Sequence, residues 1–389
     1  MYYVRKLKVG KNDLLDQLAL ECGRLYTQNL VCFWRVVRKK EIWLKPSSMM
    51  RWHSSDKLHA HTADAVVQSF FSAMSGWREA RKSNSSLKPP YKLKKYFKIE
   101  WKSSAIRIKN GMLALSNGKK TPAIVLPWRF ELPTKVEIGW GGKQYELRAV
   151  YTEEVSMQPI GNEVAGLDLG EIHLAVTYDG TNCYIFNGKE LRSKRQYQNK
   201  INAEIQSRLS KKKKGSRRFG KLLKSKRKQL NSLDNQIQDI SHKQTTTLIH
   251  TLHNEGVKIV VIGDLRNLRQ NVDVGHTNNQ KVHQMISGKI RGMVEYKVVR
   301  LGMSTKLQDE SYTSQTCPVC SHRYKPKGRN YKCSKCGFKY HRDGVGSVNI
   351  RGKYLGSGQV VGVMASPIGV RYKPHMRCSS GSGIKAATA

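Results

Sequence analysis

Four of the eight cysteines stand in two closely spaced pairs, and no other feature constrains the fold of this chain as strongly. Cys317 and Cys320 form one pair, Cys333 and Cys336 form the other, and 12 residues separate the pairs. Each C-x-x-C turn presents two thiolates, and two such turns complete a tetrahedral set for Zn²⁺. Gly337 follows the second pair, where the turn needs a residue that tolerates positive φ. Because the protein supplies all four ligands, we predict one structural Zn²⁺ ion and not a catalytic one.

Two disulfides or a redox-active pair are the alternatives for these cysteines. The other four, Cys22, Cys32, Cys183 and Cys378, are scattered, which does not make a disulfide framework in a chain of this length. The pattern is typical of a reducing compartment, with one metal site and ordinary buried thiols. We therefore favour zinc and expect a cytoplasmic protein.

The charge balance of the chain is strongly basic, with 70 Lys and Arg residues against 28 Asp and Glu residues and a formal net charge of +42. Like charges repel one another in a compact fold, so the excess by itself destabilises the folded chain. A polyanion that releases condensed counterions is the usual partner of such a surface. An anionic membrane is the alternative, but no apolar stretch reaches membrane-spanning length and no signal peptide opens the chain. We predict a nucleic-acid partner and no membrane partner.

The N-terminal part combines helical and strand patterns. An imperfect alternation predicts a strand over Met1–Val9, and helical periodicity predicts helices over Asn12–Lys39 and Lys57–Arg81. Pro89 and Pro90 end the helical region. Short alternations with Gly and Pro punctuation over 92–152 predict a small antiparallel β-barrel, into which the helices are inserted after the first strand.

The C-terminal part has the pattern of a mixed α/β domain. An apolar strand over 164–170 is interrupted by one carboxylate, Asp168, and a second strand follows over 172–178. The nearly continuous apolar run Val257–Ile262 predicts a buried, parallel and central strand. A helix over 282–301 and a short strand from Met303 to Gln308 come next, before the cysteine pairs.

A long basic stretch connects the parts of this domain. From Lys189 to Lys228 the chain carries 17 Lys or Arg residues and only two Glu residues. A charge run is usually a solvated face, but the length and one-sidedness of this run favour a pair of helices that follows a nucleic acid. Aromatic and basic residues also interleave between Tyr91 and Phe97, which suits stacking on unpaired bases. The candidate nucleic-acid contacts in the stretch are Lys211, Lys212, Lys213, Lys214, Arg217 and Arg218.

Two carboxylates stand out as candidate catalytic residues. Asp168 lies within an apolar strand, where a charge is costly unless it is paired or coordinates a metal. Asp343 follows the cysteine pairs, at the first turn of an expected helix. Carboxylates that converge from distant segments can hold the two Mg²⁺ ions of a phosphodiester-cleaving centre.

Five segments of the C-terminal part stand out together. They are Gly166-Leu-Asp168-Leu-Gly170, Val261-Ile-Gly-Asp264-Leu, Tyr312-Thr-Ser-Gln-Thr-Cys317, the two cysteine pairs, and Arg342-Asp343 ahead of Asn349-Ile350. In their sequence and order they resemble the TnpB family, the transposon-encoded relatives of the type V CRISPR effectors, and the resemblance covers residues 161–355.

The resemblance implies an RNA-guided DNA endonuclease with a guide RNA, a double-stranded DNA target, two Mg²⁺ ions and one structural Zn²⁺. It implies a prokaryotic, nucleoid-associated protein, and leaves open whether the chain is a monomer or a homodimer. The implied fold is α/β plus β-barrel and multidomain. Its parts are a wedge β-barrel (1–10 and 90–160), a helical recognition domain (11–89), an RNase H-like RuvC nuclease domain (161–316 and 337–356), a target-nucleic-acid-binding zinc ribbon (317–336) and a partly disordered tail (357–389).

One position departs from the family pattern. Gly263 stands where the commonest pattern has a metal-binding Glu before Asp264. Asp264 could replace this Glu, although neighbouring strand residues point to opposite faces and a bend would be needed. Glu310, on the segment before Tyr312, could instead supply the carboxylate. The third alternative is a nuclease-dead protein that keeps RNA-guided DNA binding.

We favour Glu310, because a decayed site would have no reason to keep Asp168 and Asp343. The predicted catalytic and Mg²⁺-binding residues are therefore Asp168, Glu310 and Asp343, with Asp264 as the alternative. Arg342 could contact the scissile phosphate, although an Arg at such a position more often has only a surface role. Asn349 is expected to support the centre, and Glu295 to pair with a Lys on a helix face.

Overall fold

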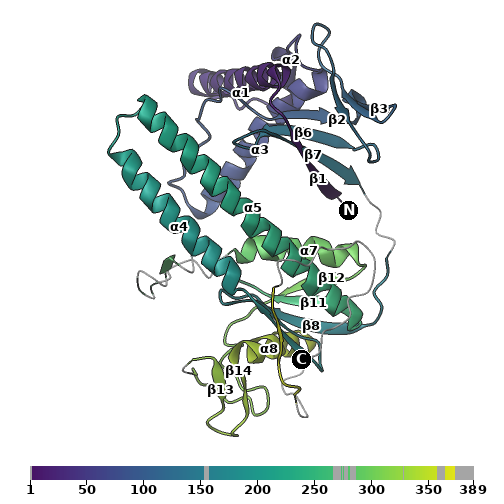
Figure 1. The fold of residues 1–389 in the computed structure, drawn as a ribbon, viewed down its shortest axis with the longest axis vertical. Coiled ribbons are helices and arrows are strands. Elements are labelled where there is room, and N and C mark those ends of the chain that lie inside the picture. The colour runs from purple at the N-terminus through teal and green to yellow at the C-terminus, as the bar shows by residue number, and fades with distance from the viewer. Residues whose placement is uncertain are drawn as a thin grey trace. The chain divides into compact units, whose positions relative to one another are not determined.

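The fold is described from a computed structural model of the chain, in which two compact units span residues 1–154 and 155–389 (Figure 1). The structure describes residues 2–152, 157–265, 273, 275, 279–280, 286–326, 328–356 and 364–372. No helix within this described part is long and apolar enough to cross a membrane.

The first unit contains two antiparallel sheets and three helices. The four-stranded sheet has the spatial order β1 (Tyr2–Val9), β7 (Tyr145–Thr152), β6 (Lys135–Trp140) and β2 (Ile99–Lys102). The three-stranded sheet consists of β3 (Ile106–Lys109), β4 (Met112–Leu115) and β5 (Ile124–Pro127). The helices α1 (Asp13–Lys40), α2 (Pro46–Trp52) and α3 (Ala60–Ser83) stand between β1 and β2 in the sequence. Strand pairing among the described residues leaves the two sheets separate, so the hydrogen bonding does not close the predicted barrel.

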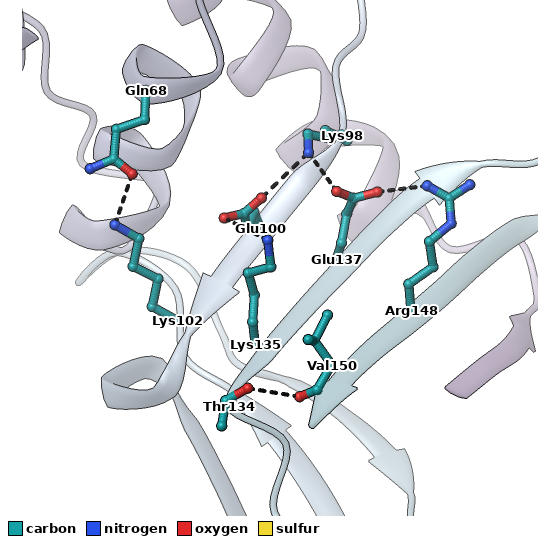
Figure 2. Close-up of polar contacts among 9 residues, drawn as sticks. All are labelled: Gln68, Lys98, Glu100, Lys102, Thr134, Lys135, Glu137, Arg148 and Val150. Atoms are coloured by element: carbon teal, nitrogen blue, oxygen red, sulfur yellow. Dashed lines mark hydrogen bonds and ion pairs between the residues drawn. The ribbon is translucent and has the colours of Figure 1, made fainter. Parts of the chain in front are cut away.

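Both sheets and the helices share one hydrophobic core. The alternation of side chains along each strand explains how β2 contributes to this core. Ile99 and Trp101 face inward and are fully buried, whereas Glu100 and Lys102 lie on the other face. On that outer face the cations of neighbouring strands neutralise each carboxylate (Figure 2). Glu137 receives Lys98 at 2.5 Å and Arg148 at 2.7 Å, and Glu100 lies 3.4 Å from Lys98.

The second unit is built on a six-stranded mixed sheet. Its spatial order is β12 (Ser304–Gln308), β11 (Val257–Gly263), β8 (Glu163–Asp168), β9 (His173–Tyr178), β10 (Cys183–Asn187) and β15 (Ile368–Val370). The predicted parallel strand is confirmed, since β11 pairs in parallel with both β8 and β12. Part of the predicted tail belongs to this sheet instead, because β15 pairs in parallel with β10. The expectation of disorder concerns residues 357–363 and 373–389, which lie outside the described residues.

Helices cover both faces of this sheet. Ala165 and Leu167 of β8 pack into the core that α5 (Arg217–Asn254) and α7 (Ser287–Arg300) share with the sheet. The other face of β8 receives α8 (Arg342–Leu355). Gly166 permits this close approach, because a Cβ there would lie 2.1 Å from the carbonyl oxygen of Ser347. The expected helix over 282–301 begins at Ser287, and residues 281–285 are outside the described part.

The basic stretch forms two helices, as predicted. α4 (Lys189–Ser210) and α5 lie side by side in a helical hairpin (Figure 1). Gln198 donates to Asp234 at 2.6 Å, and Lys194 to Gln236 at 2.9 Å, across the pair. α5 continues well beyond Lys228 because its second half buries apolar side chains against the sheet, among them Leu248 and Leu252.

Candidate active site and metal sites

Asp168 is the last residue of β8, at the floor of a pocket of about 410 Å³ that is also lined by Asp343, His173, Arg329 and Arg342. Asp168 was expected in the middle of a strand, but it lies at the end of one. Gly346 of α8 leaves room for the carboxylate, since a Cβ at that glycine would lie 2.6 Å from Oδ2 of Asp168. The close contact between β8 and α8 brings the end of the strand next to the first turn of the helix.

Glu310 lies against Gly263, the position at which the family pattern predicts a carboxylate. A Cβ on Gly263 would be 2.5 Å from Oε2 of Glu310 and 3.1 Å from Ile350. The carboxylate of Glu310 thus occupies the space that a side chain at the end of β11 would fill. Glu310 belongs to the turn that follows β12, and not to the strand itself as expected.

The turn that carries Glu310 is held in two ways. Tyr312 adopts a left-handed backbone with a φ of 64°, and the N–H and hydroxyl of Thr313 both donate to the carbonyl oxygen of Glu310. The side-chain amide of Asn349 donates at 2.7 Å to the carbonyl oxygens of Thr313 and Thr316. Asn349 therefore ties the turn to α8 and supports the position of Glu310, in agreement with the sequence expectation.

Within the described part of the chain, no ion pair is formed by Asp168 or Glu310, although the charges of Arg342 and Arg329 partly offset the rise in the pKa of Asp168. Burial, with the charges of Glu310 and Asp343, raises the pKa of Asp168 to about 8. Burial, with the charges of Asp264 and Asp309, raises the pKa of Glu310 to about 7. Carboxylates that repel one another in a dense protein environment fit a site for divalent cations, because a bound cation removes both penalties.

Asp264 stands beside Glu310, and neither of these two residues belongs to the lining of the pocket that contains Asp168. Its backbone N–H donates to the carbonyl oxygen of Gln308, and its charge contributes to the raised pKa of Glu310. Asp264 is thus close to Glu310, whereas the contact with Gly263 is made by Glu310 itself.

Asp343 lies in the first turn of α8 and lines the same pocket as Asp168. The guanidinium of Arg329, from the hairpin between the cysteine pairs, donates to Oδ2 of Asp343. His173 places Nε2 4.0 Å from the same oxygen. Arg342 lines the same pocket. Sequence reasoning found Asp343 and Arg342 but missed Arg329 and His173, because only the tertiary fold brings these two residues to the carboxylates.

Two further expectations concern residues outside the pocket lining. The basic residues at 211–214, 217 and 218 lie in the turn between α4 and α5 and at the start of α5, and all are exposed. None of them lines the pocket that contains Asp168 and Asp343. Glu295 is a helix-face residue as expected, but it pairs with Arg291 at 3.3 Å and not with a Lys, because Arg291 stands one helical turn before it.

The four cysteines of the two pairs come together in the structure. Their sulfur atoms all lie within 4.8 Å of one another, with Cys317 to Cys336 and Cys320 to Cys333 each at 3.6 Å. A tetrahedral Zn²⁺ bound at about 2.3 Å from each sulfur requires a similar spacing. The set is therefore compatible with a zinc ribbon.

The backbone around the cysteines supports the same arrangement. Gly337 has a φ of 75°, as predicted, and Ser321 takes the matching left-handed position after Cys320 with a φ of 57°. The short strands β13 (Asn330–Lys332) and β14 (Lys339–His341) pair in an antiparallel hairpin that leads directly into α8. Through this hairpin the cysteine site is continuous with the segment that carries Arg329 and Asp343.

Comparisons with known proteins agree with the motifs. Residues 148–269 match a family model described as a probable transposase, and residues 288–350 match the TNB domain of Cas12f1-like proteins. The TnpB-like protein ORF457 of Acidianus two-tailed virus is 27% identical over 240 residues. That similarity covers 59% of this chain and 50% of the viral protein, so the chain spans about half the length of this curated relative.

Two solved structures are similar in fold. A Cas12f1–sgRNA–target DNA complex has a TM-score of 0.58 at 14% identity, over 87% of this chain and 82% of the other. The mini-RNA-guided endonuclease CRISPR-Cas_phi3 has a TM-score of 0.53 at 8% identity, over 94% of each chain. The class that these likenesses define is a mixed α/β protein with the fold of Cas12 effectors. Within it, the two family matches and the viral relative support membership of the TnpB family.

Proposed function

We propose that this protein is an Mg²⁺-dependent, RNA-guided DNA endonuclease whose active site consists of Asp168, Glu310 and Asp343 on an RNase H-like RuvC fold. The proposal rests on the position of the Glu310 carboxylate, which lies in the space beside Gly263. The strand end that lacks a carboxylate of its own is thereby supplied with one from a neighbouring segment. Loss of the site by decay would not explain this replacement.

The three carboxylates would hold the metal ions, which supply Lewis-acid activation of water and stabilise charge on the leaving oxygen. The role of the protein is to hold these groups at fixed positions. Asp168 is placed by the contact of β8 with α8, and Glu310 by the turn tied to Asn349. Arg329 and Arg342 line the same pocket, where guanidinium groups favour a phosphate of the substrate.

The proposed partners are a guide RNA and double-stranded DNA. In such a system, base pairing reads the target sequence while the protein reads heteroduplex shape and a short adjacent motif. The net charge of +42 and the exposed basic turn between α4 and α5 suit this division of work. The first unit is proposed to act as the wedge and helical recognition domain, with two separate sheets in place of a closed barrel, and residues 317–336 as the zinc ribbon.

The test is plasmid cleavage by the full-length protein purified with its co-expressed RNA. We expect Mg²⁺-dependent cleavage that follows the guide sequence, and at least an approximately 10²-fold loss in Glu310→Gln, as for other groups that stabilise charge in a transition state. Glu295→Gln removes a carboxylate from a helix face and serves as the matched control, with unchanged cleavage.

The outcomes separate the alternatives. Normal cleavage by Glu310→Gln together with loss in Asp264→Asn would transfer the role to Asp264. Guide-dependent DNA binding without any cleavage in the unaltered protein would establish the nuclease-dead alternative and overturn the proposal.

A further inference from the structure

We propose that His173, His341 and Asp343 form a nitrogen-containing metal site that selects a first-row transition-metal ion such as Mn²⁺ over Mg²⁺. One ligand atom from each residue lies within 4.8 Å of the other two. The proposal deepens the proposed function, on which it rests for the role of Asp343 in catalysis but not for metal binding itself. It concerns the pocket lined by His173 and Asp343, to whose lining Gly263 and Glu310 do not belong.

The spacing of the three groups is close to that of a coordination sphere. Nε2 of His173 lies 4.0 Å from Oδ2 of Asp343, and the two imidazole rings are 5.1 Å apart between centroids. Ligand atoms that each lie about 2.0–2.2 Å from one ion are roughly 3–4 Å apart. Small side-chain rotations would therefore close the set around an ion, without any change in the backbone.

Hydrogen bonding places little constraint on the two rings. The described part of the chain offers no hydrogen-bond partner to the buried Nδ1 of His173. His341 is the N-cap of α8, where its Nδ1 accepts a long contact of 3.3 Å from the backbone N–H of Asp343. Neither ring is fixed by a strong hydrogen bond that metal binding would have to break.

The carboxylate already attracts a positive partner. The Arg329 guanidinium donates to Asp343, and the same oxygen faces His173. A bound dication would replace Arg329 at this oxygen and release it toward the open pocket, which both residues line. The cavity thus has room for the ion and for the displaced side chain.

The ligand types set the preference for the ion. Mg²⁺ favours oxygen ligands and retains water, whereas imidazole suits transition metals. Two imidazoles and one carboxylate therefore favour first-row transition metals over Mg²⁺, with Mn²⁺ as the weakest binder of that series and a paramagnetic probe of the site. Asp168 and Glu310, by contrast, offer only oxygen.

The experiment is Mn²⁺ binding by the zinc-loaded, full-length protein in a large excess of Mg²⁺, followed by electron paramagnetic resonance. Loading first with one equivalent of Zn²⁺ per chain fills the four-cysteine site, which binds Zn²⁺ most tightly, and leaves the histidine site open to Mn²⁺. We expect bound Mn²⁺ with electron spin-echo modulation from ¹⁴N, the signature of imidazole ligands. His173→Phe keeps the ring contact and His341→Asn keeps a capping side chain. Each single variant should weaken the ¹⁴N modulation, and the double variant should remove it. Mn²⁺ affinity should fall at least about 10- to 100-fold, the loss typical of even an outer-shell partner.

The exposed His250 on α5 provides the matched control, and His250→Asn should change neither the affinity nor the modulation. Bound Mn²⁺ without ¹⁴N modulation, or modulation that survives the double variant, would overturn the proposed site. Cleavage in Mg²⁺ with no such modulation would leave the nuclease function standing and the histidine site refuted. The ¹⁴N signal in a protein that never cleaves DNA would support the histidine site and refute the proposed nuclease function.

Discussion

At Gly263 the end of β11 offers no side chain, and Glu310 fills the space from a different segment. Two residues far apart in the sequence therefore share the space of one position in the proposed site. Such a replacement is possible because the turn after β12 runs alongside the end of β11, where Asp264 donates its backbone N–H to Gln308. The carboxylate at this place comes from the segment after β12 and not from the end of β11.

The exchange can be reversed by mutation. Gly263→Glu and Glu310→Ala should each lower guided cleavage, the first because two side chains compete for one space and the second because the carboxylate is lost. The double variant should regain part of the activity of the unaltered protein, since the carboxylate returns to the end of β11. A double variant no more active than Glu310→Ala would show that the two positions are not equivalent.

The pH dependence of stability follows from the raised pKa values of Asp168 and Glu310, at about 8 and 7. Both values are above those of unfolded carboxyls, so the folded state binds more protons and loses stability as pH rises through the folded pKa values. We expect the Tm of Mg²⁺-free, zinc-loaded protein to fall between pH 5 and pH 8, over about the interval between unfolded and folded pKa values.

Mg²⁺ should reverse this loss, because it stabilises the ionised carboxylates. The increase in Tm on adding Mg²⁺ should be larger at the upper end of this pH range than at its lower end. Asp168→Asn should show a smaller fall with pH and a smaller gain from Mg²⁺. An equal effect of Mg²⁺ at both ends of the range would contradict the assignment of these carboxyls to a cation site.

At the scale of elements, the contact of β8 with α8 positions the site. Gly166 lets the helix backbone approach the strand, and Gly346 leaves room for Asp168. The same helix carries Asp343 at its first turn and Asn349 farther along. One helix–strand contact therefore places one carboxylate directly and supports the other two.

Gly166→Val should separate these elements, because its Cβ would meet the backbone oxygen of Ser347 at 2.1 Å. Overpacking costs about 1–3 kcal/mol, and a backbone contact this close belongs at or above the upper end. The measurement is the free energy of unfolding by urea, with cleavage assayed in parallel. Gly292→Ala is the control, since α7 has open space there and the change should stabilise by about 0.4–1 kcal/mol.

The cysteine hairpin is the second element that reaches the pocket, through Arg329. Cys333→Ser should lower the zinc content from one ion per chain to nearly none, because three ligands no longer close the tetrahedron. Cleavage should fall with it as Arg329 and the start of α8 lose their support. Cys32→Ser, in the first unit, should leave the zinc content unchanged when metal is measured by mass spectrometry. Full zinc retention in Cys333→Ser would rule out the four-cysteine site.

At the scale of the whole molecule, the charge of +42 should govern the proposed association with nucleic acid. The positive charge is not equally available over the surface. On the outer sheet face of the first unit, cations pair with carboxylates, whereas the turn between α4 and α5 is basic and exposed. The exposed turn is thus the better candidate for phosphate contacts.

Replacement of Lys211, Lys212, Lys213 and Lys214 by Gln should weaken binding of the co-expressed RNA. For every phosphate that the variant no longer neutralises, the dependence of log K on log salt should become shallower by about 0.7–0.9. The measurement is RNA affinity at several salt concentrations. An unchanged salt slope would exclude this turn from the RNA interface. Zinc content and unfolding free energy should stay as in the unaltered protein, because these side chains are exposed.

Local patterns in the sequence determined the elements of this protein and its chemically unusual residues. The spacing of the cysteines, the carboxylate of Asp168 in an apolar run and the one-sided charge of the basic stretch are each visible within a short window. The family resemblance then pointed to Gly263 as a departure and to Glu310 as its replacement.

Only the tertiary structure decided which groups share space. The approach of Glu310 to Gly263 depends on the parallel pairing of β11 with β12, and the cluster of His173 with His341 depends on the packing of α8 across the sheet. The addition of β15 to the sheet was equally hidden, because a three-residue strand has no periodicity to recognise. The physical reason is common to all three, since contacts between distant segments follow from packing of the whole domain and leave no signal in the local sequence.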